Sequence, residues 1–126
     1  MTTTDRNHTS QVEIERKYAV DEGHAVPTLT GIGAATGTPV TDAVALDAFE
    51  LEATYYDTAT LALARHRIAL RRRRGGHDEG WHVKLPADEG RTELQWPLGE
   101  SEGAGVPDEV ADAVRALVRD LSLIHI

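Results

Sequence analysis

The residues best suited to do chemistry lie in the segment EIERK, residues 13–17. Successive side chains of a β-strand point to opposite faces, so a strand here would place Glu13, Glu15 and Lys17 on one face. Same-face neighbours lie roughly 6–7 Å apart, and two carboxylates at that spacing can converge on a hard cation such as Mg2+. The lysine, one step further, can meet a phosphate as a point charge. An amphipathic strand with a solvated charged face explains this segment equally well.

Positive charge is concentrated in one short part of the chain. Six of the thirteen Lys and Arg residues fall within residues 65–74, although the net charge of the chain is −8. That net charge makes nucleic acid the least favoured of the possible partners. Because the arginines of an otherwise acidic chain are gathered in one segment, they predict a local anion site. Taken alone, Arg71–Arg74 would also fit a solvated strand edge.

Several classes of protein are excluded or disfavoured by what the sequence lacks. It contains no cysteine, which excludes disulfides and thiolate metal sites and favours the reducing cytoplasm. The N-terminus is polar, without the apolar core of a signal peptide. No apolar run approaches the ~20 residues of a membrane span. We therefore expect a cytoplasmic protein with no membrane partner.

Turn residues and alternation divide the chain into strands. Residues 1–10 are predicted to be a disordered leader, and frequent Gly and Pro in 21–48 allow only a short helical turn and a weak strand near 38–41. A short helix or turn is expected at 61–65. Five segments have strand character: 11–20, 48–57, 68–74, 81–86 and 91–98. Short turns between most of them favour an antiparallel sheet.

The last part of the chain has helical spacing. Pro107 suits a first helical position, with Asp108 and Glu109 in the first turn. Apolar residues recur at helical spacing from 106 to 121, which predicts an amphipathic helix of about four turns with its apolar stripe in the core. Residues 122–126 are interpreted as an apolar tail that is not native to the domain.

Each predicted strand has one ionic and one mainly apolar face. Lys84 shares a face with His82, and Glu93 shares one with Arg91 and Gln95. A closed or strongly curved sheet would focus these faces into one polar interior, with helices outside. Arginine forks would bind phosphate oxygens there, with the glutamates on a divalent metal. His82 itself is predicted to be a packing or surface histidine.

Five motifs, in this order, resemble the CYTH domain, also called the triphosphate tunnel metalloenzyme fold. They are EIERKY at 13–18, YYDT at 55–58, ALRRRR at 69–74, WHVKLP at 81–86 and RTELQ at 91–95. The resemblance covers residues 11–121 and implies an α+β fold around an antiparallel tunnel of eight strands. About five strands and the C-terminal amphipathic helix are found here, so we expect an open half-tunnel that is inactive alone.

The resemblance also implies the site residues. Family members bind a triphosphate inside the tunnel with Mg2+ or Mn2+, and many hydrolyse it. Carried over by position, the catalytic set is Glu13, Glu15 and Lys17, and the metal ligands are Glu13, Glu15 and Glu93. The phosphate contacts are Lys17, Arg71, Arg73, Lys84 and Arg91. Gln95 departs from the pattern, because the family often has an acidic residue there.

The expected function is metal-dependent binding, and in the complete protein hydrolysis, of inorganic triphosphate or a related small compound. Two alternatives stay open: a non-catalytic module that binds polyphosphate or nucleotides, and class IV adenylate cyclase chemistry on the same scaffold. The resemblance further implies that a longer chain could carry a helical CHAD domain, which is associated with polyphosphate.

Overall fold

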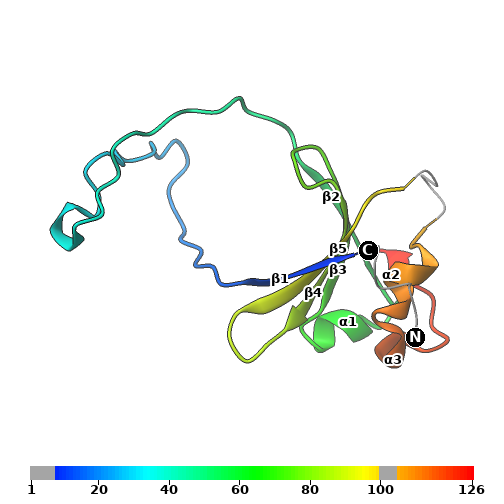
Figure 1. Cartoon of the computed structure of the whole chain (residues 1–126). Helices are drawn as coiled ribbons and strands as arrows, with labels where there is room; N and C mark the ends of the chain where they lie inside the picture. Colours follow the sequence, from blue (N-terminus) through cyan, green and yellow to red (C-terminus); the bar gives the residue numbers. More distant parts are fainter. Residues whose placement is uncertain (1–7, 100–104) are drawn as a thin grey trace. The chain divides into compact units, whose positions relative to one another are not determined.

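The computed structural model describes residues 8–99 and 105–126 (Figure 1). The chain forms two compact units. One combines the N-terminal segment up to Glu15 with Phe49–Ile126, and the other is Arg16–Ala48. The first unit holds the sheet and the helices, and each unit is described by itself.

The first unit is built on an antiparallel sheet of six strands in the order β1-β5-β4-β3-β2-β6. The strands are β1 Thr9–Glu13, β2 Glu52–Asp57, β3 Ala69–Arg74, β4 Gly80–Pro86, β5 Arg91–Trp96 and β6 Ile124–His125. In the described residues β1 and β6 are the two edges, so the sheet is open. The antiparallel α+β architecture is confirmed, with one short strand more than expected. That strand, β6, comes from the segment interpreted as a non-native tail, and it pairs with β2.

The core lies on the apolar face of the sheet, under three short helices: α1 Ala62–Arg65, α2 Asp108–Asp112 and α3 Arg115–Val118 (Figure 1). It is formed by Leu63, Leu70, Trp81, Val83, Trp96, Val110, Val114 and Val118. Trp81, Val83 and Trp96 are the alternate residues that the strand pattern assigned to the apolar faces. Burying this face against helices leaves the other face of β3, β4 and β5 for the ionic side chains, as expected.

The predicted four-turn helix is wrong in one respect. The segment forms two short helices, α2 and α3, because the backbone of Val114 (φ −119°, ψ 8°) leaves the helical region between them. Val110, Val114 and Val118 are nevertheless all buried. Short helices derive their stability mainly from such packing, so the break leaves the apolar stripe intact.

Asp57 explains why α1 begins where it does. Its buried carboxylate accepts hydrogen bonds from the backbone N–H groups of Thr58, Leu63 and Ala64, at 2.7, 2.9 and 3.0 Å. Helix N-termini leave such donors without partners inside the helix. The expected short helix at 61–65 is therefore confirmed. Arg67 then takes a positive φ of 61°, which interrupts the chain before β3.

The interruption separates two arginines from the strand. Only an unbroken strand from residue 65 would put Arg65 and Arg67 in phase with Arg71. Arg65 instead ends α1, and β3 begins only at Ala69. The ionic face of β3 is thus supplied by Arg71 and Arg73.

The expected strand at 11–20 is also corrected. β1 starts two residues earlier, at Thr9, which was expected in the leader, and it ends at Glu13. Glu13 pairs with Arg91, the first residue of β5. The residues before Arg91 form the β4–β5 turn, so residues 14–20 find no strand there to pair with. Residues 1–7 of the predicted leader lie outside the described residues.

The unit Arg16–Ala48 contains a single 3-10 turn, Ala34–Thr36, between two glycines. The predicted short helical turn is therefore found. The weak strand near 38–41 is not, although Gly31 and Val40 are joined by a backbone hydrogen bond of 2.8 Å. In the parts of both units that the structure describes, no helix has the length and apolar character needed to cross a membrane.

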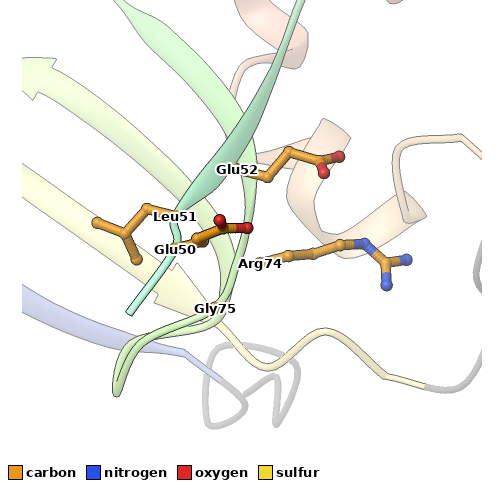
Figure 2. Close-up of a pocket in the computed structure, with 5 residues that line it drawn as sticks. All are labelled: Glu50, Leu51, Glu52, Arg74 and Gly75. Carbon is orange, nitrogen blue, oxygen red and sulfur yellow. The ribbon is translucent and has the colours of Figure 1, made fainter. Parts of the chain in front are cut away.

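A surface pocket lies where the β3–β4 hairpin meets the start of β2. It is lined by Glu50, Leu51, Glu52, Arg74 and Gly75 (Figure 2). Glu52 and Arg74 are register partners, and Figure 2 shows Leu51 pointing away from them. Gly75 has φ +86°, and a Cβ on it would lie 2.0 Å from the carbonyl oxygen of Glu50. This pocket contains none of the predicted site residues.

Candidate anion and metal site

Two of the predicted site residues, Glu13 and Glu93, meet around the ammonium group of a third, Lys84. The register places Lys84 on β4 opposite Glu93 on β5, with β1 on the far side of β5. Lys84 Nζ lies 3.0 Å from Glu13 Oε2 and 3.5 Å from Glu93 Oε2. The pairing of β1 with β5 therefore brings Glu13 to Lys84, which lies 71 residues later in the chain (84 − 13). That contact cannot be read from the local pattern.

Glu93 is the most enclosed member of this cluster, with 1% of its surface exposed. Gln95 donates a hydrogen bond to Glu93 Oε1. Arg71 Nη2 lies 3.9 Å from Glu93 Oε2, and His82 Nδ1 lies 3.8 Å from Glu93 Oε1. Gln95, the departure from the family pattern, thus serves here as a neutral donor to the buried carboxylate.

Two carboxylate oxygens of the cluster fit a divalent cation. Oε2 of Glu13 and Oε2 of Glu93 are buried and accept no well-directed hydrogen bond in the described part of the chain. Mg2+ prefers such oxygen ligands and is commonly held by one or two carboxylates together with substrate phosphates and waters. Glu13 and Glu93 could hold it in this way.

The third predicted metal ligand, Glu15, is placed differently. It lies two residues beyond the end of β1, and its side chain is exposed. Across residues 8–99 and 105–126, no three His, Cys, Asp or Glu side chains are grouped so that they could hold a metal ion. The structure brings Glu13 and Glu93 to the ammonium group of Lys84. The role of Glu15 as a metal ligand stays a prediction.

Arg71 is held by His82, its register partner on β4. Arg71 Nε and Nη2 lie 3.2 and 3.1 Å from His82 Nδ1, and His82 Nε2 lies 2.9 Å from the carbonyl oxygen of Asp78. A guanidinium carries only donors, so Nδ1 accepts and Nε2 donates, which is the neutral imidazole. Burial lowers the pKa of His82, the positive charge of Arg71 lowers it further, and Glu93 opposes both.

Sequence reasoning assigned His82 only a packing or surface role. It is buried, with 1% exposed, but on the ionic face. The available signal was its position two residues before Lys84, on the same strand face. Its contact with Arg71 required the hairpin register, and its contact with Asp78 required the shape of the loop.

The remaining predicted phosphate contacts differ in how they are held. Arg73 Nη1 donates to Asp78 Oδ2 at 2.8 Å. Arg91 donates to the backbone carbonyl oxygens of Arg67 and of Lys84, so it ties the α1–β3 turn to the sheet. Lys17 belongs to the unit Arg16–Ala48, and its part in the site stays a prediction.

The family model for the CYTH domain matches residues 11–124. Two curated relatives from Mycobacterium tuberculosis are similar to this chain. They are "Uncharacterized protein MT2285" from strain CDC 1551 / Oshkosh and "Uncharacterized protein Rv2226" from strain ATCC 25618 / H37Rv. Each is 46% identical over 110 residues, which cover 86% of this chain and 20% of the relative. The chain thus spans about a fifth of the length of these relatives.

Proposed function

Because the chain belongs to the CYTH domain family, we propose that its ionic face binds a small triphosphate compound together with Mg2+ or Mn2+. We further propose that the complete protein hydrolyses inorganic triphosphate or a related compound. The observation that carries this proposal is the cluster around Lys84, where Glu13 and Glu93 converge on one ammonium group. Arginine forms forked hydrogen bonds with phosphate, and carboxylate oxygens bind divalent metals, so the two side by side suit a site that holds phosphate and metal together.

The charge on this face supports a role for the metal. Among the described residues of the sheet, four predicted phosphate contacts give this face four positive charges: Arg71, Arg73, Lys84 and Arg91. Three carboxylates lie among them: Glu13, Asp78 and Glu93. The small excess of positive charge is less than the several negative charges of a triphosphate. A divalent cation between the carboxylates and the phosphates would supply the balance.

The residues of the chain have separate parts in the proposed mechanism. Arg71 and Arg73 would bind phosphate oxygens through forked hydrogen bonds, and Lys84 would contact them as a point charge. Together they would stabilise the charge on the transferred phosphoryl group. Glu13 and Glu93 would hold the metal, which when bound supplies Lewis-acid polarisation of phosphate and activation of water.

One observation favours binding without hydrolysis by this chain itself. The sheet is open at β1 and β6 in the described residues, so the ionic face is not enclosed by strands. Phosphoryl transfer depends on positioning and on exclusion of bulk water. We therefore propose that this chain binds triphosphate or polyphosphate but releases little phosphate.

The wider setting of the chain is likewise proposed. The absence of cysteine supports a cytoplasmic location. The relatives are about five times longer than the matched part, so a helical CHAD domain in a longer protein is a reasonable further proposal. Nucleic acid is disfavoured as a partner by the net charge of −8.

A calorimetric titration with tripolyphosphate and Mg2+ tests the proposed function, with a matched pair of variants from β3. Arg71 lies on the ionic face, whereas its neighbour Arg72 lies 6.0 Å from the ring centroid of Trp81 on the opposite face. Arg71→Met and Arg72→Met remove the same charge from adjacent positions. We expect Arg71→Met to weaken binding by about tenfold or more, and Arg72→Met by less than about threefold.

The outcomes separate the candidate functions. Equal losses in the two variants, or no binding by the unchanged chain, would refute the proposed site. Phosphate release measured on the same samples distinguishes a hydrolase from a binding module. Cyclic AMP formed from ATP would instead select the cyclase alternative.

A further inference from the structure

The contacts of His82 give it a part that the proposed function does not assign. Its Nδ1 lies close to both Arg71 and Glu93, 3.1 Å from Arg71 Nη2 and 3.8 Å from Glu93 Oε1. It is almost fully buried, on the face that carries the cations. We propose that His82 is a positioning residue, which holds the guanidinium of Arg71 in place for a phosphate group and keeps it from closing onto Glu93. This inference rests on the proposed function.

The loop of the β3–β4 hairpin fixes the orientation of the ring. The carbonyl oxygen of Asp78 accepts the hydrogen bond of His82 Nε2 at 2.9 Å, so the lone pair of Nδ1 is directed at Arg71. The side chain of the same Asp78 accepts the hydrogen bond of Arg73 at 2.8 Å. One loop residue therefore contacts both arginines on the ionic face of β3, Arg73 directly and Arg71 through His82.

Arg71 would otherwise have a competing partner. Its Nη2 is already 3.9 Å from Glu93 Oε2, a buried oxygen that accepts no well-directed hydrogen bond from any described residue. A guanidinium and a carboxylate form forked ion pairs when geometry permits. Closing that pair would occupy both the phosphate ligand and the proposed metal ligand. Nε and Nη2 of Arg71 donate to His82 Nδ1. No hydrogen bond within residues 8–99 and 105–126 occupies Nη1 of Arg71, which leaves it available to a phosphate.

Two polar replacements of similar size separate this role from simple packing. In His82→Asn, the amide oxygen falls near the position of Nδ1 and still accepts from Arg71. In His82→Gln, the amide falls near the position of Nε2, so it keeps the contact with Asp78 and offers Arg71 no acceptor. The two variants thus separate the contacts of His82: Asn keeps the acceptor for Arg71 and gives up the contact with Asp78, whereas Gln does the reverse.

The test is calorimetric binding of tripolyphosphate with Mg2+ to the chain and its variants, with urea unfolding to compare stability. We expect His82→Asn to bind within about threefold of the unchanged chain, and His82→Gln to bind about tenfold more weakly. Because His82 acts through Arg71, adding His82→Gln to Arg71→Met should cause no further loss. A purely structural role would move stability in both variants and would not depend on Arg71.

Failure of this inference and failure of the proposed function give different results. If the unchanged chain does not bind tripolyphosphate, the proposed function fails. If it binds and both His82 variants bind alike, the positioning role is overturned while the function stands. Additive losses in the double variant would also overturn it, since they would mean that His82 acts independently of Arg71.

Discussion

Asp57→Ala should be among the most destabilising single substitutions in the first unit. The side chain is buried, with 2% of the residue exposed. Its two oxygens accept three backbone hydrogen bonds of 2.7–3.0 Å, from Thr58, Leu63 and Ala64. Two of these donors belong to α1, which carries Leu63 into the core. Alanine would leave all three amide groups without this acceptor.

The size of the effect follows from these contacts. A hydrogen bond to a charged group contributes about 1.5–3 kcal/mol. The sum of three such contributions is an upper limit on the loss of stability, because the variant can relax. Fraying of the first turn of α1 would let water reach the amides of Leu63 and Ala64. We therefore expect a loss of about 3–5 kcal/mol in the free energy of unfolding, against about 5–15 kcal/mol for a typical domain.

Urea titrations followed by far-ultraviolet circular dichroism measure this loss. Asp57→Asn should be intermediate, since one oxygen can still accept while the amide nitrogen faces a donor. Asp112→Ala is the matched control, because Asp112 is exposed and its one hydrogen-bond donor among the described residues is Arg115. This substitution should cost at most about 0.5 kcal/mol. A loss below about 1 kcal/mol for Asp57→Ala would refute the reasoning.

Three further predictions concern the turn, the ionic cluster and the buried histidine. Gly75→Ala should destabilise the chain by about 2 kcal/mol more than Gly99→Ala in urea titrations, because both glycines have positive φ but only at Gly75 would a Cβ meet a backbone oxygen; equal losses would contradict this. Lys84→Met should lower the free energy of unfolding by about 3 kcal/mol at pH 7, because the carboxylates of Glu13 and Glu93 lose the cation they share. Adding Glu93→Gln should recover part of that loss, whereas no recovery would argue against a charge effect. Burial lowers the pKa of His82 below 6.5, so the folded chain binds this proton less tightly than the unfolded chain. The free energy of unfolding should therefore be highest above pH 6.5 and fall as the pH drops through 6.5 towards the lowered pKa. Urea titrations at pH 7.5 and 5.5 should show a smaller fall for His82→Gln than for the unchanged chain, and an equal fall would be evidence against this assignment.

The ionic and apolar faces could be predicted because strand alternation is a local property. Val83 and Lys84 must point to opposite faces whatever the strand pairs with. The same holds for Leu94 and Glu93. The burial of Val83 and Glu93, on opposite faces of the sheet, agrees with that rule. The short helix before β3 was also predictable, because the segment between two strand patterns is short and apolar.

The limits of the strands could not be predicted in the same way. β1 ends at Glu13 because its partner β5 begins at Arg91, and nothing in residues 14–20 signals the loss of a partner. The break at Val114 has the same character, since the apolar spacing continues through it. These boundaries depend on which surfaces remain available after the sheet has formed.

The sequence by itself determined which side chains share a face and which carry the charge, since both follow from residue type and a period of two. Only the tertiary structure decided which charges meet. The register of β1, β5 and β4 brings Glu13 and Glu93 to Lys84, and the β3–β4 hairpin brings His82 to Arg71. Register is set by pairing between distant segments and by turn geometry, so a contact between residues 13 and 84 has no local signal.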